Sequence, residues 1–255
     1  MTNSTLANST ADPSLAAGSA RSGTVGRIRS VTDPIESGDL SQYRTTYREY
    51  AAAIYELAEA ELPVLQARIA DWLGVSRPSV SEMVHRMAED GLVEIGDEIT
   101  LTEAGRHLAE VVVRRHRLAE RFLTEVLGLP WVKVHEEAEV WEHAISDQVE
   151  KAMWDKLDDP KTCPHGNPIP GAGYRAPAVE PLAQVEGRVA VLERISEELE
   201  LDDEIMDFLD VSGLRPGATV ETVARTPDGT LTVRVDGHHQ VGLGPFIAER
   251  VYVIR

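Results

Sequence analysis

A short acidic segment carries the residues with the most evident chemistry. The stretch HEEAEVWEHAISDQVE, residues 135–150, places six acidic or imidazole side chains within nine positions. It lacks Pro and Gly, and it has a helical period of apolar residues that predicts one buried stripe, made of Val134, Ala138, Trp141, Ile145 and Val149. His135, Glu139, Glu142 and His143 then fall on one helix face beside that stripe.

Carboxylates crowded on one helix face repel each other unless a positive charge lies between them. The segment has almost no Lys or Arg one turn away that could relieve this repulsion. A solvated acidic face is the ordinary interpretation, but the two histidines on the same face favour a bound divalent cation. Because Cys163 is the only cysteine, a disulfide and a thiolate cluster are excluded, and oxygen and nitrogen ligands are expected.

The composition limits the class of protein. A chain of 255 residues with 42% hydrophobic residues can form two modest domains with tails. It has no apolar run long enough to span a membrane, and its first residues lack the features of a secretory signal, so we expect a cytoplasmic protein without a membrane partner. The formal charge of −18 argues against general affinity for nucleic acid, so any DNA binding must be local and conditional.

The first half of the chain divides into an extension and a DNA-binding domain. Residues 1–40 are rich in Ser, Thr, Ala and Gly, which predicts a disordered extension. Residues 41–104 predict a helix, then a helix-turn-helix, then a two-stranded wing. Ser76 is placed to cap the second helix of that motif, about residues 77–87, and Pro78 suits its first turn. The segment is therefore interpreted as a winged helix-turn-helix.

The second half predicts a helical domain followed by a small β-barrel. A long helix from about Thr102 precedes the acidic helix, and residues 105–175 are assigned to an all-α domain. The proline-rich stretch 160–185 is typical of a linker, and 176–185 are assigned to the linker proper. Residues 186–255 contain short alternating strands around one brief acidic helix, typical of an SH3-like barrel. The fold class is α+β.

Four motifs in this order resemble the diphtheria toxin repressor family of metal-dependent regulators. They are IYEL at 54, VVRRHRLAERFLTEVLGL at 112, KVHEEAEVWEHAISDQVE at 133 and GNPIPG at 166. The resemblance covers about residues 42–255. It implies a homodimeric transcriptional repressor that binds a palindromic double-stranded DNA operator, with a divalent metal as corepressor and no enzymatic activity or small-molecule substrate.

The resemblance implies a primary metal site made of Glu49, Glu139, Glu142 and His143. The iron branch of the family has Met and Cys where this chain has Glu49 and Glu139, so its hard carboxylates suit Mn²⁺, with Fe²⁺ as the alternative. A Bacillus-like form of the manganese branch has a further acid where Ala52 stands here, which leaves its two-metal arrangement open.

The resemblance also implies a second site, for up to two ions per chain. Its ligands would be His116, Glu120, His135, Glu197 and Glu200, where Glu200 replaces a Gln of the iron branch. The segment SEELELDDE, which contains Glu197 and Glu200, could instead be a solvated acidic helix. In CPHGNPIPG, Cys163 and His165 are interpreted as parts of a structural loop and not as ligands.

For DNA, the family pattern points to the second helix of the helix-turn-helix. Ser76, Pro78 and Ser79 match positions that touch DNA in the family, and Glu82 stands where Gln is frequent and could accept from cytosine N4. Arg77 and Arg86 are candidates for phosphate or guanine contacts, although both could be ordinary exposed arginines.

Two enzyme interpretations are weaker. A di-metal carboxylate oxidase needs inward Glu-x-x-His pairs from two helices, whereas Glu-x-x-Glu-His occurs here once. HEEAE fails the H-E-x-x-H pattern of zinc proteases because Glu139 replaces the second His. A metal buffer without DNA function is disfavoured by the winged helix.

Overall fold

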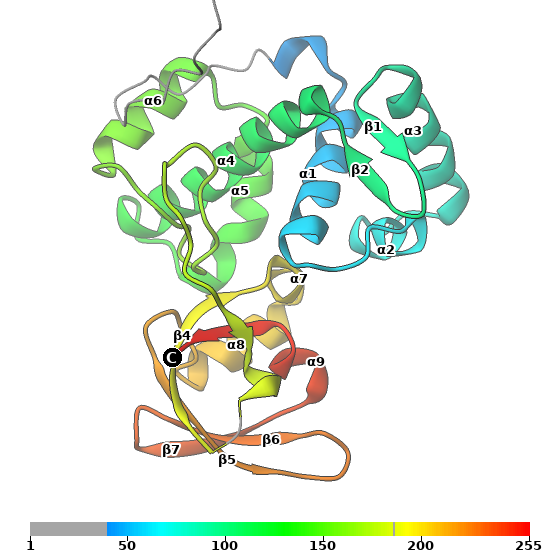
Figure 1. Ribbon diagram of the computed structural model, residues 1–255. Coiled ribbons are helices and arrows are strands. Elements are labelled where there is room, and N and C mark those ends of the chain that lie inside the picture. The colour runs from blue at the N-terminus through cyan, green and yellow to red at the C-terminus, as the bar shows by residue number, and fades with distance from the viewer. Residues whose placement is uncertain (1–39, 186) are drawn as a thin grey trace, which may run out of the picture. The chain divides into compact units, whose positions relative to one another are not determined.

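The computed structural model describes residues 40–185 and 187–255. The predicted disordered extension therefore lies, apart from Leu40, outside the described residues. Figure 1 shows the described elements in chain order, from helices with a short hairpin, through a second group of helices, to a carboxy-terminal sheet. This order confirms the predicted α+β class.

The amino-terminal domain is a helix-turn-helix with a short wing. Its elements are η1 (Leu40–Gln42), α1 (Thr45–Glu59), α2 (Gln66–Trp72), α3 (Arg77–Glu89), β1 (Val93–Ile95) and β2 (Ile99–Leu101). The Ser76 hydroxyl accepts from the Ser79 N–H, and Pro78 lies in the first turn of α3, as predicted. Helix α3 extends two residues beyond its predicted end.

One apolar core unites this domain with the first half of α4 (Glu103–Glu125). It includes Tyr50, Ile54, Leu57, Val80, Val84, Met87, Leu108, Val111 and Val112. Thr102 caps α4 by accepting from the Gly105 N–H at 3.1 Å. A Cβ at Gly105 would lie 1.9 Å from the carbonyl oxygen of Leu92, so only glycine permits this close approach. The start of α4 is thereby held against the segment between α3 and β1.

The acidic segment forms two helices, so the prediction of one continuous helix is wrong. The short helix η2 (Trp131–Lys133) leads into α5 (Val134–Glu142), and a separate helix, α6 (Asp147–Lys156), follows. The break is favoured by Ser146, whose hydroxyl accepts from the Val149 N–H and caps α6. Because the helical phase is interrupted, Val149 is 46% exposed and does not continue the buried stripe.

The first part of the proline-rich stretch packs inside the protein, so its interpretation as a linker is wrong for residues 163–169. Cys163, His165, Asn167 and Ile169 are buried. The Asn167 amide donates to the Ile195 carbonyl oxygen at 2.9 Å. This loop therefore forms part of the contact between the helices and the carboxy-terminal domain.

The carboxy-terminal domain is built on an antiparallel sheet with the strand order β3-β8-β4-β5-β6-β7 among the described residues. The strands are β3 (Glu180–Pro181), β4 (Val189–Ile195), β5 (Thr219–Arg225), β6 (Leu231–Val235), β7 (His239–Leu243) and β8 (Val251–Ile254). The helices are η3 (Leu182–Gln184), α7 (Glu197–Glu200), α8 (Asp203–Val211) and α9 (Pro245–Ala248). Alternating burial in β6 confirms the predicted half-buried strand pattern.

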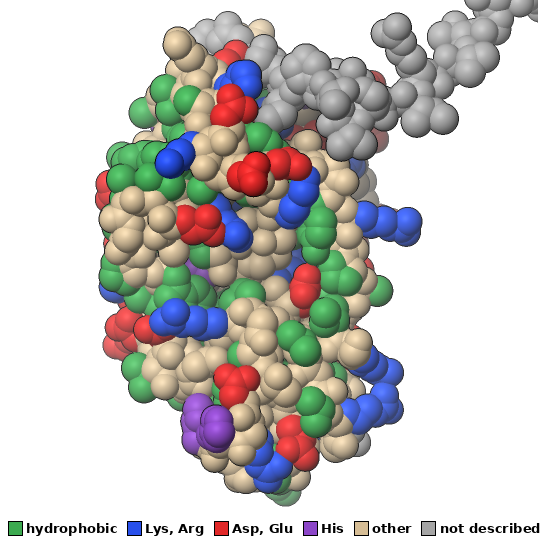
Figure 2. All heavy atoms as spheres, turned by 90° about the vertical axis from the view of Figure 1, so that its left-hand side faces the viewer, with side chains coloured by type: hydrophobic (Ala, Val, Ile, Leu, Met, Phe, Trp, Pro, Cys, Tyr) green, Lys and Arg blue, Asp and Glu red, His purple; other side chains and the backbone are tan. Residues whose placement is uncertain are grey.

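The charged side chains are mixed on the face shown in Figure 2. Lys and Arg side chains lie among Asp and Glu side chains on this face, although the chain has a formal charge of −18. The acidic excess is therefore not one continuous patch on this side of the molecule.

Candidate metal centre

Four segments bring ionisable side chains to one buried cluster. His116 and Glu120 lie one turn apart on α4, so they share a helix face. His135 enters from the first turn of α5, and Glu200 from the end of α7. The 163–169 loop adds His165 beside them. These residues are far apart in the sequence, and they meet only because α4, α5, α7 and the 163–169 loop pack together.

One half of the cluster is made of residues that the sequence analysis named as ligands of the second metal site. The imidazole Nε2 of His116 lies 3.3 Å from Glu120 Oε1, and Nδ1 of His135 lies 3.4 Å from the same oxygen. The two imidazoles approach each other at 3.1 Å between His116 Nε2 and His135 Nδ1. His116, Glu120 and His135 therefore converge on one point.

The other half contains residues that the sequence analysis assigned to a structural loop. His165 Nδ1 lies 2.9 Å from Glu200 Oε2 and 3.5 Å from Glu120 Oε1. Cys163 Sγ lies 4.0 Å from the same His165 nitrogen. Cys163 and His165 thus combine a structural role in the loop with a place among candidate ligands. The signal in the sequence was the Cys-x-His spacing, which is weak without the partner Glu120.

The donor set fits a divalent metal ion. Among the described residues, donor atoms of His116, Glu120 and His135, and those of Glu120, Cys163 and His165, lie within 4.8 Å of one another. Both carboxylate oxygens of Glu120 and one of Glu200 are buried without a hydrogen bond, since the nearby imidazoles lack hydrogen-bond geometry. Buried carboxylate oxygens in this state are costly unless a positive charge satisfies them.

The electrostatics of the cluster balance imidazolium against carboxylate. Burial lowers the pKa of His135, but the carboxylates of Glu120 and Glu200 beside it outweigh burial and raise the pKa to about 10. Burial raises the pKa of Glu120, yet His165 and His116 hold it well below its usual value. The protein therefore holds protons on imidazoles at neutral pH, and a metal ion must displace them.

The predicted primary site is more open. Glu49, Glu139, Glu142 and His143 line one cavity of 530 Å³. His143 Nε2 lies 4.0 Å from Glu49 Oε1, and His143 Nδ1 lies 3.6 Å from Glu142 Oε1. The side chains of Glu49 and Glu139 are 46% and 58% exposed. The four residues share a cavity, but they do not converge as closely as the buried cluster.

His116 and Glu142 connect the two groups. His116 Nδ1 lies 2.8 Å from Glu142 Oε2, while the other His116 nitrogen faces Glu120. A carboxylate of the open group is thus hydrogen-bonded to an imidazole of the buried group. The two groups are therefore neighbours that this hydrogen bond connects.

Glu197 and Glu200 differ in their surroundings. Glu200 contacts His135 and His165, whereas Glu197 Oε1 accepts from Nε of Arg117 at 2.8 Å. Burial and the adjacent Glu197 carboxylate also raise the pKa of Glu56 well above its usual value. In this arrangement Glu200, and not Glu197, is directed at the histidines.

The predicted DNA-contacting residues lie on the exposed side of α3. Ser76, Arg77, Pro78, Ser79, Glu82 and Arg86 are exposed. Arg86 Nη2 donates to Glu82 Oε1 at 2.5 Å, so these two form an ion pair on the helix surface. His85, which the sequence analysis did not name, is also exposed there, and its only signal was its position one turn from Glu82.

A helix-turn-helix joined to clustered imidazole and carboxylate ligands defines a metal-responsive DNA-binding protein. Family models match three consecutive parts of the chain. They are the iron-dependent repressor N-terminal DNA-binding domain at 44–98, the metal binding and dimerisation domain at 102–171, and the FeoA domain at 181–255.

Relatives of this chain belong to the same class of protein as the matching family models. The chain is 40% identical over 222 residues to the iron-dependent repressor IdeR of Mycobacterium tuberculosis, covering 82% of this chain and 96% of that protein. It is 39% identical over 205 residues to the diphtheria toxin repressor of Corynebacterium diphtheriae, covering 75% and 89%. The chain belongs to the diphtheria toxin repressor family, and it is a metal-dependent transcriptional repressor and not an enzyme.

Solved structures include repressors that respond to manganese. A manganese-dependent transcriptional repressor in complex with manganese matches with a TM-score of 0.75 at 34% identity, covering 82% of this chain and 99% of that chain. The manganese regulator SloR matches with a TM-score of 0.68 at 31% identity, covering 82% and 98%. In the part of the chain that the structure describes, no helix has the length and apolar character needed to cross a membrane.

Proposed function

We propose that this chain is a cytoplasmic, homodimeric repressor activated by Mn²⁺, and that it controls genes of manganese homeostasis. The observation that carries this proposal is the carboxylate of Glu139, which lines one cavity with Glu49, Glu142 and His143. Three carboxylates and one imidazole are hard or borderline donors, which suit Mn²⁺. The similarity to a manganese-dependent transcriptional repressor and to the manganese regulator SloR supports the same choice.

Glu49, Glu139, Glu142 and His143 would hold the primary ion, whose positive charge relieves the repulsion of the carboxylates. Glu49 lies on α1, while the other three lie on or directly after α5. Because α1 and α3 share one core, fixing Glu49 relative to α5 also fixes the recognition helix. Without that neutralisation, the DNA-competent arrangement is a minor population.

A second ion would be held in the buried cluster, which gives up to two ions per chain. His116, Glu120 and His135 supply donors, and Glu200 adds one from the carboxy-terminal domain. Cys163 and His165 extend this donor set on the far side of Glu120. Glu197, which was predicted as a further ligand, is engaged by Arg117 and is left out of the proposed set.

A second copy of the chain is the partner proposed for the helical domain. Val140 on α5 is 66% exposed and Val149 on α6 is 46% exposed, and such apolar surface suits a dimer interface. Two recognition helices would then be spaced by about 34 Å for successive major grooves of a palindromic operator. Ser76, Arg77, Pro78, Ser79, Glu82 and Arg86 would contact the DNA.

Activation by Fe²⁺, with control of iron uptake and storage genes, is the second candidate. It is favoured by the 40% identity to IdeR and by the thiol of Cys163 beside Glu120, which is a softer donor than a carboxylate. The two candidates differ in the metal that activates DNA binding.

Metal-titrated DNA binding tests the proposal. The full chain is titrated with Mn²⁺, Fe²⁺ and Zn²⁺ against a duplex selected in vitro from a random library, and affinity is measured by fluorescence anisotropy. We expect activation by Mn²⁺, and we expect Glu139→Cys to move the ranking toward Fe²⁺ and Zn²⁺, because thiolate prefers softer ions. An unchanged ranking in Glu139→Cys would remove this residue from the primary site.

A further inference from the structure

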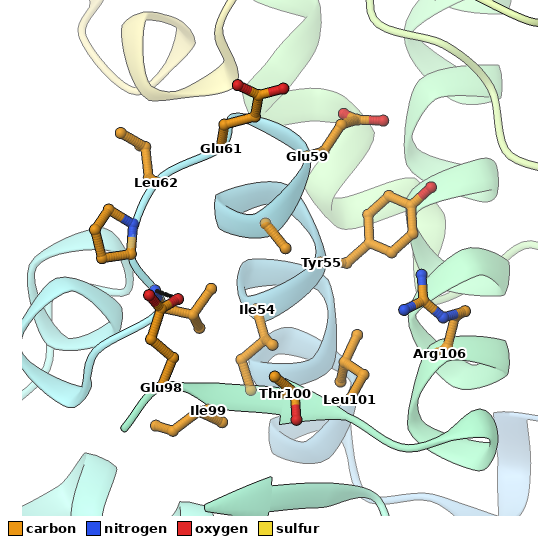
Figure 3. A pocket seen from close by; sticks show the side chains of 13 residues that line it. Ile54, Tyr55, Glu59, Glu61, Leu62, Glu98, Ile99, Thr100, Leu101 and Arg106 are labelled. Atoms are coloured by element: carbon orange, nitrogen blue, oxygen red, sulfur yellow. Dashed lines mark hydrogen bonds between the residues drawn. The ribbon is translucent and has the colours of Figure 1, made fainter. Parts of the chain in front are cut away.

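The last turn of α1 is held by the carboxy-terminal domain at a point remote from the proposed primary ligands. Glu59 ends α1, ten residues after Glu49, which corresponds to about 15 Å along the helix axis. Figure 3 shows Glu59 leaving this turn on the side of α4, at the rim of a 610 Å³ cavity. Its side chain is 22% exposed, so its charge is largely removed from water.

Arg117 of α4 binds Glu59 through a planar fork. Nη1 and Nη2 of Arg117 donate to the two Glu59 carboxylate oxygens at 3.1 and 2.5 Å. Nε donates to Glu197 on α7 at 2.8 Å, and Nη1 also donates to the Pro168 carbonyl oxygen at 2.5 Å. The Arg117 side chain is fully buried, so its charge depends on these partners. The bidentate geometry fixes direction as well as distance.

Arg194 of β4 approaches Glu59 from the sheet. Its Nη1 lies 3.8 Å from Glu59 Oε2, and its Nη2 donates to the Glu59 carbonyl oxygen at 3.5 Å. The guanidinium lies over the Tyr252 ring of β8, 4.4 Å from its centroid, which holds it in place. The side chain and the main chain of the end of α1 are therefore both contacted by the carboxy-terminal domain.

We propose that Glu59 is a positioning residue through which the carboxy-terminal domain sets the orientation of the DNA-binding domain. Its carboxylate accepts from Arg117, which also donates to Glu197 of α7, and its carbonyl oxygen accepts from Arg194 of β4. The inference rests on the proposed metal-dependent DNA binding, but none of these three residues is a proposed ligand. Because α1 shares its core with α3, a fixed end of α1 restricts the recognition helix. We call the contact of Glu59 with Arg117 and Arg194 the joint. The joint contributes to the DNA-competent orientation of the recognition helix in addition to the metal.

The test separates metal binding from DNA binding in the full chain. Arg194→Met keeps the apolar stem and removes the charge, and Arg194→Lys restores a charge. Arg234→Met is the matched control, because Arg234 pairs with Glu221 on the neighbouring strand of the same sheet and does not reach α1. Each variant is measured for Mn²⁺ affinity by calorimetry and for affinity to the selected duplex at saturating Mn²⁺.

We expect Arg194→Met to bind DNA about fivefold more weakly than the wild type, as for loss of a partly exposed ion pair, while its Mn²⁺ affinity stays within about twofold. Arg194→Lys should recover part of the loss, and Arg234→Met should match the wild type. In a double-mutant cycle, Glu59→Gln should remove the part of the Arg194→Met effect that comes from the side-chain ion pair, while the hydrogen bond to the Glu59 carbonyl oxygen remains. Equal DNA affinity in Arg194→Met and Arg234→Met would overturn the proposal.

Hydrogen exchange distinguishes failure of this inference from failure of the proposed function. If the wild type shows no Mn²⁺-dependent DNA binding, the proposed function fails. The joint is then judged by amide exchange in the last turn of α1, which should be faster in Arg194→Met than in Arg234→Met. Equal exchange in the two variants would refute the joint whatever the DNA result.

Discussion

The buried cluster around Glu120 and the open cluster of Glu49, Glu139, Glu142 and His143 contain similar candidate ligands in different environments. Glu120 in the buried cluster is fully buried, and imidazoles from α4 itself, from α5 and from the 163–169 loop lie within 3.5 Å of its Oε1. In the open cluster, Glu139 is 58% exposed, and Glu49 lies on a helix of the DNA-binding domain. The buried cluster is formed by packing alone, whereas the open cluster is completed by the relative position of α1 and α5.

This difference assigns different tasks to the two clusters. A preformed buried site can bind an ion without rearrangement, so it suits a structural ion that joins α4, α5 and α7. An exposed site that needs residues from two domains couples its occupancy to their orientation, because the ion binds one arrangement better than the others. We therefore propose the open cluster as the sensor.

The largest expected effect is on stability, from Glu120→Ala. The substitution removes the carboxylate that faces His116, His135 and His165, so we expect the free energy of unfolding of the metal-free protein to fall by about 3–5 kcal/mol. Glu139→Ala, the matched change in the open cluster, should alter it by less than about 0.5 kcal/mol. Urea denaturation in chelator measures both. Equal losses would show that the clusters do not differ in this way.

The next effect is on activation, from His143→Ala. We expect Mn²⁺-dependent DNA binding to weaken by at least about 100-fold, because a ligand of the open site is lost. His143 is 31% exposed and lies outside the apolar stripe, so the dimer should remain intact. Sedimentation velocity checks the dimer beside the DNA titration. A monomer in sedimentation would make His143 a structural residue.

A smaller effect distinguishes the two acids of α7. Glu200→Gln should weaken Mn²⁺ binding at the buried cluster by about tenfold, because Glu200 faces His135 and His165. Glu197→Gln should leave that affinity nearly unchanged, because Glu197 faces Arg117. Calorimetry on the two variants measures the difference. A loss confined to Glu197→Gln would reverse this assignment.

The last prediction concerns the pH dependence of stability in the metal-free protein. The pKa of His135 is raised from 6.5 to about 10, so its contribution to stability is complete below pH 6.5 and is lost as pH rises toward 10. Mn²⁺ affinity at the buried cluster should change in the opposite direction and rise with pH, because protons compete with the metal. Denaturation in chelator at several pH values tests the first trend. A flat profile, or the same profile in His135→Gln, would contradict it.

Local pattern in the sequence was sufficient for most elements of the fold. The alternation in LTVRV predicted β6, and the Ser-x-Pro start and apolar spacing predicted α3. These signals are local because each depends on hydrogen bonding and side-chain period within a few residues. The break between α5 and α6 was missed because the apolar period continues across it, while the Ser146 cap ends the helix.

The sequence by itself determined which residue types are available to the candidate metal sites, because the motif at 133–150 and the His116–Glu120 spacing place imidazoles and carboxylates on two helical segments. Only the tertiary structure decided which of them meet. In the folded protein, Cys163 and His165 of the 163–169 loop lie beside Glu120. Glu197 forms an ion pair with Arg117, whereas Glu200 contacts the histidines. The physical reason is that a ligand set depends on distances between atoms far apart in the chain, which are fixed by the packing of whole helices and not by local spacing.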